Sequence, residues 1–460
     1  MLIAAFILIL AACTATPTSA DLSDNGSASS GGDSSSSGSG DNAVAPAQGE
    51  SSYDTIMKLL DDPSGALAFS GLQPPTYDSR ESINKGLPVQ PKPASEIKIG
   101  WSSASLGSEF FEAQRDYCLY KADQFGMPKP DLQNADFSLE TQQNHIDTFI
   151  TNKVDVMLVN CIDIYSEIPY YQKAIDAGIP VLTTGPTPAT PDIPIITNVI
   201  PSSFENGVLV GKYCAEKLYK KGEVLKVGML LIKLDHADSH ARPCGWIAGF
   251  LLQSAEMDGH PYASEWDAYL EAYNIWSKFK DTRKYDLSEK GLNLVQMGIA
   301  DNTDAASAQQ ASVDVLAASP DMDLFLVEAD SMAIGALAEM RQQGIEPGKD
   351  MKVATFADGT VTSLDMIISG DLMCTAANNP YLTAGSIMDI IYGIFADPDQ
   401  PAYNQFANNL PANSIMPPYI VNTENVQQYY PAFPDDKLNK FATFDPWVPL
   451  SIPQYNAQNG

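Results

Sequence analysis

The residue types that carry most enzyme chemistry are sparse in this sequence. Only four histidines occur, and two of them, His236 and His240, are four residues apart, so a helix would place both on one face, as in many metal sites. No HExxH frame surrounds them and the segment is polar, so we interpret them as solvated loop residues. GxSxG, GxGxxG and P-loop motifs do not occur either. The pattern predicts no enzyme, no metal site and no cofactor.

The six cysteines do not suggest a metal or redox motif. Cys13 follows an apolar stretch, and no two cysteines form a CxxC pair. An exported protein permits disulfides, but their connectivity does not follow from the spacing. We therefore favour buried free thiols. The remaining cysteines are Cys118, Cys161, Cys214, Cys244 and Cys374.

The charge balance excludes two classes of partner. The 460 residues contain 27 Lys and Arg against 57 Asp and Glu, a formal net charge of −30. Nucleic acids and anionic membrane surfaces are bound mainly through Lys and Arg. We therefore expect no nucleic-acid partner, and membrane contact only through an anchor.

The N-terminus indicates export and anchoring. Residues 1–12 (MLIAAFILILAA) are apolar but too few to span a bilayer, which is typical of a signal peptide. The following Leu10-Ala11-Ala12-Cys13 looks like a bacterial lipobox, so Cys13 is expected to carry lipid at the mature N-terminus. Residues 13–50 are rich in Ser and Gly and predict a disordered, lipid-anchored linker.

From residue 96 onward, apolar strands alternate with helices. Strands that are apolar throughout, rather than at every second residue, indicate parallel sheets covered on both faces. About ten units are too many for one sheet, so we predict two α/β lobes with a ligand cleft at the carboxyl ends of their strands. Two segments depart from this strand–helix alternation: residues 258–290, which we interpret as an insertion in the second lobe, and the tail from Pro401. The clearest predicted strands are 96–102, 155–161, 180–184, 226–232, 292–298, 323–327, 351–356 and 372–376.

Six segments, in order, resemble the periplasmic sugar-binding proteins of ribose type, which are type I periplasmic binding proteins. They are IGWSSASLGSEFF (99–111), ITNKVDVMLVNCID (150–163), AIDAGIPVLTT (174–184), ARPCGW (241–246), EADSMAIGALAEMRQQG (328–344) and FADGT (356–360). The resemblance implies two Rossmann-like lobes joined by three hinge crossings, with a sugar held between them. It places residues 96–199 and 379–414 in the N-terminal lobe, and residues 200–378 and 415–460 in the C-terminal lobe.

The same resemblance suggests eight ligand-binding residues. Aromatic rings such as Phe110 stack on the apolar face of a sugar, and an Arg–Asp pair holds hydroxyl groups by donating and accepting hydrogen bonds. We expect Arg242 and Asp358 to lie in the cleft rather than the core, so that the fold survives their replacement. Asp330 matches an aspartate that caps the helix beginning at Ser331, and for this residue we favour the structural role over ligand contact. The full set is Ser108, Phe110, Phe111, Asn160, Arg242, Asp330, Asp358 and Asn378.

The sequence also departs from the ribose-type pattern. Ser108 stands where an asparagine is usual, Gly185-Pro186 replaces an Asp-Arg pair, and Ala329 replaces an asparagine. Ala357 is an additional residue before Asp358-Gly359. These changes argue against ribose itself, and aromatics of the insertion such as Trp266 or Trp276 are candidates for replacement contacts.

The resemblance implies an extracytoplasmic lipoprotein that captures a sugar or polyol as a monomer and delivers it to the permease of an ABC importer. One alternative keeps the fold but makes the chain a lipid-anchored sensor, of a sugar or an autoinducer-like molecule, for a chemoreceptor or kinase. A third alternative is an enzyme on the same scaffold.

Overall fold

The computed structural model describes residues 43–74, 76, 91–396 and 410–429. The predicted signal peptide, Cys13, most of the predicted linker and much of the C-terminal tail lie outside these residues. Within the described part of the chain, no helix has the length and apolar character needed to cross a membrane.

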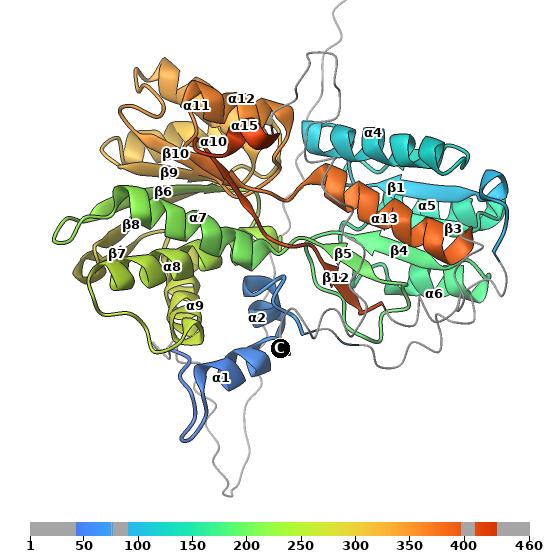
Figure 1. The fold of residues 1–460 in the computed structure, drawn as a ribbon, viewed down its shortest axis with the longest axis horizontal. Helices are drawn as coiled ribbons and strands as arrows, with labels where there is room; N and C mark the ends of the chain where they lie inside the picture. Colours follow the sequence, from blue (N-terminus) through green and yellow to red (C-terminus); the bar gives the residue numbers. More distant parts are fainter. Residues whose placement is uncertain (1–42, 75, 77–90, 397–409, 430–460) are drawn as a thin grey trace, which may run out of the picture. The chain divides into compact units, whose positions relative to one another are not determined.

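The first lobe is built on a six-stranded parallel sheet within the described residues, in the order β12-β5-β4-β3-β1-β2. Helices α4 and α13 cover one face, and α5 and α6 cover the other (Figure 1). Its elements are η1 (Ala94–Glu96), β1 (Ile99–Ser103), α4 (Glu109–Gln124), β2 (Asp131–Asn134), α5 (Leu139–Asn152), β3 (Val156–Asn160), α6 (Ile168–Asp176), β4 (Val181–Thr184), β5 (Asn198–Ile200), α13 (Pro380–Phe395) and β12 (Asn413–Ile415).

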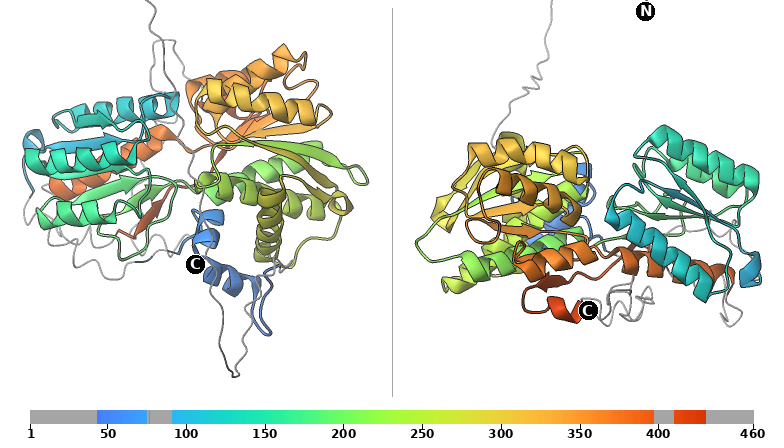
Figure 2. Two further views of the ribbon diagram at one scale, coloured as in Figure 1. Left: turned by 180° about the vertical axis from the view of Figure 1, so that it is seen from behind. Right: turned by 90° about the horizontal axis from the view of Figure 1, so that it is seen from above.

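The second lobe has a seven-stranded sheet within the described residues, in the order β13-β11-β10-β9-β6-β8-β7. Only the outer pairs β7–β8 and β11–β13 are antiparallel. Helices α7, α8 and α9 lie on one face and α10, α11 and α12 on the other (Figure 2). Its elements are α7 (Ser203–Leu218), β6 (Leu225–Leu231), α8 (Asp238–Met257), α9 (Glu265–Thr282), β7 (Tyr285–Leu287), η2 (Ser288–Lys290), β8 (Leu292–Ile299), α10 (Ala305–Ala318), β9 (Leu324–Val327), α11 (Asp330–Gln342), β10 (Lys352–Thr355), α12 (Val361–Ser369), β11 (Cys374–Ala376), β13 (Ile420–Asn422) and α15 (Val426–Tyr429).

The chain passes between the two sheets at three places: from β5 to α7, from β11 to α13, and from β12 to β13. The predicted fold class, two parallel α/β lobes joined by three crossings, is therefore confirmed. The physical basis is visible in β3, where all five residues are buried because helices cover both faces of the sheet.

The segment before the first strand also belongs to the fold. Helices α1 (Ser52–Leu59) and α2 (Pro63–Ala68) pack on the second lobe, against α9 and α8. Val44 exchanges two hydrogen bonds of 2.8 Å with the side chain of Asn274 on α9. The segment expected to be a linker up to residue 50 thus has its last residues in contact with the second lobe.

The insertion at 258–290 forms α9 and β7. A capping box between Ser264 and Asp267 starts α9, and Arg283 ends it in a left-handed conformation. Its rings are core residues, since Trp276 and Phe279 have no exposed surface. The five cysteines of the described residues are buried and free.

Candidate functional site

A cavity opens where the carboxyl ends of the strands of both sheets face each other. It encloses about 800 Å³, including space open to solvent. The first lobe and the crossings line it with Ala104, Ser108, Phe110, Phe111, Gln114, Phe137, Asn160, Cys161, Thr184, Gly185, Pro186, Pro201, Asn378 and Thr383. The second lobe lines it with Ile232, His236, Asp238, Arg242, Thr303, Ala329, Ser331 and Asp358. Seven of the eight residues predicted to bind a ligand are in this set.

The aromatic side of the cavity comes from the start of α4 and the loop after β2. The rings of Phe110 and Phe111 meet edge to face with centroids 5.3 Å apart, and Phe137 lies 6.0 Å from Phe111. Phe137 has a positive φ of 55° and remains 42% exposed. Half-buried rings in a cavity offer flat apolar surfaces to a ligand. Ser108 precedes them as the N-cap of α4, and its side chain makes no capping bond.

Asn160 is held in place by the protein on both sides of its amide. Its Oδ1 accepts a 2.6 Å hydrogen bond from the indole of Trp101, and its Nδ2 donates to Gln114 Oε1 at 2.6 Å. An amide has two donor hydrogens and two acceptor lone pairs, so half of its capacity is left for a ligand. The sequence pattern predicted Asn160 but missed Gln114, which lies one helical turn after Phe110 and shares its side of α4.

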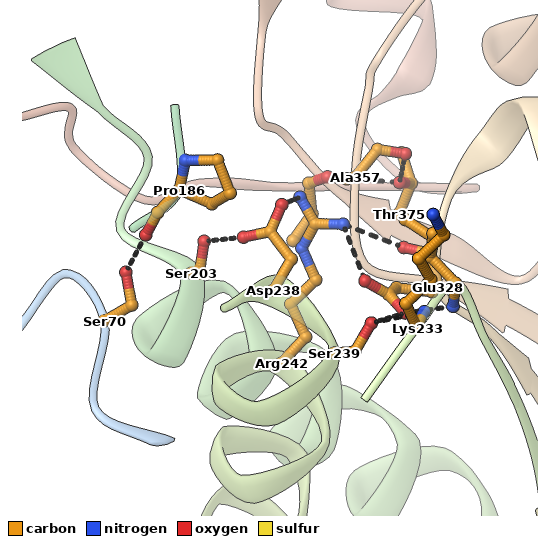
Figure 3. Close-up of polar contacts among 12 residues, drawn as sticks. Ser70, Pro186, Ser203, Lys233, Asp238, Ser239, Arg242, Glu328, Ala357 and Thr375 are labelled. Atoms are coloured by element: carbon orange, nitrogen blue, oxygen red, sulfur yellow. Dashed lines mark hydrogen bonds and ion pairs between the residues drawn. The ribbon is translucent and has the colours of Figure 1, made fainter. Parts of the chain in front are cut away.

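Arg242 lies on α8 between two carboxylates (Figure 3). Its Nη2 is 2.7 Å from Asp238 Oδ2, and its Nη1 is 3.8 Å from Glu328 Oε1 and 3.3 Å from the Glu328 carbonyl oxygen. Only 2% of Arg242 is exposed. Arg242 therefore lines the cavity and is also buried, whereas we expected it to lie in the cleft rather than in the core.

Glu328 lies on the opposite side of Arg242 from Asp238 and is itself held by hydrogen bonds. Its Oε2 accepts hydrogen bonds of 2.7 Å from the Ile232 amide and from the Ser239 hydroxyl. Burial raises the pKa of Glu328 to about 7, although Arg242 favours the charged form. Asp238 and Glu328 were missed in the sequence, yet the signals exist: Asp238 stands four residues before Arg242 on one helix, and Glu328 directly follows an apolar strand.

Asp358 sits in the loop after β10 with φ at 105°, a conformation that only glycine adopts readily. Its Oδ2 accepts the Ser331 amide at 3.3 Å, and the side chain lines the cavity while only 5% of the residue is exposed. Burial, followed by the neighbouring Asp330 carboxylate, raises its pKa. A strained, buried carboxyl group at the edge of a cavity fits a functional role.

Asp330 is the one predicted residue that the structure places behind the cavity wall. Its Oδ1 accepts from Thr355 and, at 2.9 Å, from Thr375, and its Oδ2 accepts from the Gly359 amide at 2.8 Å. Burial raises its pKa. These bonds join β10, β11 and the Asp358 loop, so Asp330 supports the cavity without lining it.

Of the departures from the ribose-type pattern, Ser108, Gly185, Pro186 and Ala329 line the cavity, and Ala357 does not. Gly185 lets the backbone of its loop lie close to Cys161, since a Cβ at Gly185 would be 2.6 Å from the Cys161 sulfur. Pro186, the next residue, also lines the cavity. Asn378 lines the cavity from the second crossing, between β11 and α13.

Two sequence interpretations are wrong. Trp266 and Trp276 do not reach the cavity: Trp276 is fully buried against His240, and Trp266 packs on Tyr53. His240 is not a solvated loop residue, because it is buried on α8 and its Nε2 lies 2.6 Å from the Leu234 carbonyl oxygen. Among the described residues, no three His, Cys, Asp or Glu side chains are grouped to hold a metal ion.

A family model and several solved structures of known proteins agree with this architecture. The model of a periplasmic binding protein domain family matches residues 99–397. No curated protein matches the sequence.

Three solved structures with the same fold share 15–19% sequence identity with the chain. A galactofuranose-binding protein has 15% identity and a TM-score of 0.55, covering 72% of this chain and 96% of its own. A solute-binding protein of an ABC transporter from Actinobacillus succinogenes, with bound D-allose, has 19% identity and a TM-score of 0.55, covering 73% and 100%. One from Bacillus halodurans, with bound myo-inositol, has 19% identity and a TM-score of 0.53, covering 73% and 97%.

Proposed function

Because the chain belongs to the periplasmic binding protein domain family, we propose that it is an extracytoplasmic receptor that captures an uncharged sugar or polyol between its lobes and delivers it to the permease of an ABC importer. The ligands named for structures with this fold, D-allose and myo-inositol among them, belong to this chemical class.

The observation that carries the proposal is the composition of one cavity. Phe110 lines it from the first lobe, while Arg242 and Asp358 line it from the second. A sugar presents an apolar C–H face, which suits the ring of Phe110. Its hydroxyl groups can accept hydrogen bonds from Arg242 and donate them to Asp358. A molecule that touches both lobes favours the arrangement in which they are close together.

The charges of the cavity favour an uncharged ligand over an acidic one. The guanidinium of Arg242 is already paired with Asp238 and approaches Glu328. Asp358 adds a further carboxyl group in the lining. Among the described lining residues, Arg242 is the only Lys or Arg, and it is already paired. A sugar acid or sugar phosphate would bring a further negative charge into this buried site, and no free cation would offset the cost of removing that charge from water.

A thermal-shift screen tests the ligand class. Neutral sugars and polyols are compared with the matching uronic acids and sugar phosphates at the same concentrations. A ligand that binds only the folded state raises the melting temperature, by about 2.7 kcal/mol of stabilisation at 100 times its Kd. Stabilisation by an acidic sugar, with none by its neutral counterpart, would exclude the proposed ligand class.

We further propose that Cys13 carries the lipid anchor of a monomeric receptor. The support is the sequence alone: a short apolar segment, a lipobox-like Leu10-Ala11-Ala12-Cys13 and a Ser/Gly-rich stretch after it. The variant Cys13→Ala should move the protein from the membrane fraction to the soluble fraction. If the variant remains in the membrane pellet, the anchor is elsewhere.

Transport and sensing are separated by an uptake measurement. Deleting the gene should abolish high-affinity uptake of the radiolabelled ligand found in the screen. If uptake is unchanged while ligand-dependent chemotaxis or transcription is lost, the chain is a sensor.

A further inference from the structure

Two segments outside the ribose-type pattern pack against each other on the second lobe. Residues 44–73, which we name the strap, run over α9, the helix of the insertion, with α1, and over α8 with α2. The Ser52 hydroxyl donates to Asp267 Oδ1 at 2.5 Å, and Val44 pairs with Asn274. The insertion thus gives the strap a docking surface.

The strap is fixed to this lobe by a buried ring. Phe69 has no exposed surface, stacks on Tyr273 at 5.4 Å and contacts Phe204 at 5.2 Å. Removing the apolar surface of such a ring from water stabilises the contact. Phe69 therefore holds the next residue, Ser70, at the start of α7.

Ser70 makes one hydrogen bond to each lobe. Its carbonyl oxygen accepts the amide of Phe204, in the first turn of α7, at 2.9 Å. Its hydroxyl donates to the carbonyl oxygen of Pro186 in the first lobe at 2.6 Å (Figure 3). Ser70 is completely buried. Gly71 brings the strap close to the crossing, since a Cβ there would lie 2.7 Å from Ser202 Cα.

Both ends of this bridge reach residues that line the cavity. Pro186 lines the cavity itself. On the other side, Ser203, which precedes Phe204, donates its hydroxyl to Asp238, and Asp238 holds Arg242. The strap therefore connects the wall of the first lobe to the helix end that supports the arginine of the second.

We propose that Ser70 is a positioning residue that holds the Pro186 loop against α7 and thereby restrains the separation of the two lobes. Because the Ser70 carbonyl is bound to α7, the lobes cannot separate along the Pro186 side without breaking the hydroxyl bond. The strap is then a connection between the lobes in addition to the three chain crossings. This inference concerns the protein without ligand, so it stands or falls independently of the proposed function.

The test measures the distance between the lobes in the absence of ligand. Spin labels are attached at Tyr120→Cys on α4 and Ile334→Cys on α11, which are 43% and 41% exposed, in full-length chain carrying Cys13→Ala. The five other cysteines are buried and should not react. Pulsed electron paramagnetic resonance then gives the distribution of distances between the two spin labels.

Ser70→Ala should shift this distribution toward longer distances, raising the ratio of separated to close lobes by about 2- to 10-fold, the equivalent of one hydrogen bond. Ser64→Ala, an exposed position on α2 of the same strap, is the matched control and should behave like the parent. Gly71→Ala keeps the hydroxyl but pushes the strap away from Ser202, so it should also lengthen the distances.

A purely structural role would lower the melting temperature of Ser70→Ala and leave the distance distribution as in the parent. That result overturns the proposal. If Ser70→Ala does not fold, Gly71→Ala takes its place in the measurement: a folded variant with an unchanged distribution also overturns the proposal.

Discussion

Asp238 and Arg242 face each other one helical turn apart on α8, with Oδ2 and Nη2 separated by 2.7 Å and both residues at most 5% exposed. This pair makes the proposed binding residue part of the core of the second lobe. Under the proposed function, ligand binding and folding are therefore linked more tightly at Arg242 than they would be at a surface arginine.

Arg242→Ala should weaken folding as well as binding. Its removal leaves Asp238 and Glu328 buried without their cation, which typically costs about 3–5 kcal/mol. The loss should be smaller at pH 5 than at pH 8, because Glu328, whose pKa is raised to about 7, takes up a proton at the lower pH. Chemical unfolding at both pH values measures this. Arg341→Ala removes a half-exposed pair with Asp371 and is the control, with little change expected.

Asp358→Asn should separate binding from folding. Asparagine tolerates the positive φ at this position better than alanine does, so the loop should keep its shape. The loss of a charged acceptor should weaken binding of the ligand found in the screen by about 10- to 150-fold, from 1.5–3 kcal/mol per hydrogen bond. Titration calorimetry measures the affinity, with the exposed Asp314→Asn as control. Parent-like affinity in folded Asp358→Asn would remove this residue from the site.

Phe110→Ala should lower affinity with little effect on folding. The ring is half-buried in the cavity and meets Phe111 edge to face, so its removal deprives a sugar of an apolar stacking surface, whose burial is worth about 25 cal/mol per Å² of apolar area. Titration of the same ligand against Phe110→Ala and against Tyr120→Ala, an exposed ring farther along α4, makes the comparison. Equal losses in both variants would show an effect on the helix rather than on the ligand.

Glu167→Gln should make the first lobe more stable at high pH. Glu167 is completely buried, accepts a hydrogen bond from the Tyr171 hydroxyl, and burial raises its pKa to about 8. The folded state thus binds a proton that the unfolded state has released, so stability falls as pH rises from about 4.5 to 8.

The glutamine has no charge to bury, so the melting temperature of Glu167→Gln should exceed that of the parent at pH 8 and approach it near pH 4.5. A constant difference between the two proteins across this range would mean that Glu167 does not titrate there.

The sequence by itself determined the architecture. Apolar strands such as β3 and β9 alternate with helices, and a strand that is apolar throughout has no stable place except between two helical layers. Most of the predicted binding residues, including Asn160 and Asp358, lie at the ends of strands or shortly after them. Since parallel strands end at one edge of a sheet, their meeting in one cavity followed from the pattern.

Only the tertiary structure decided which polar residues face that cavity and which support it. Asp330 and Asp358 both follow buried strands. Three hydrogen bonds hold the Asp330 side chain behind the cavity wall, whereas Asp358, in a loop with positive φ, lines the cavity. Trp276 likewise belongs to the core because α9 packs against α8, and Ser70 contacts Pro186 although 116 positions of sequence separate them. Such contacts depend on how side chains of distant elements fill space together, and local periodicity carries no information about them.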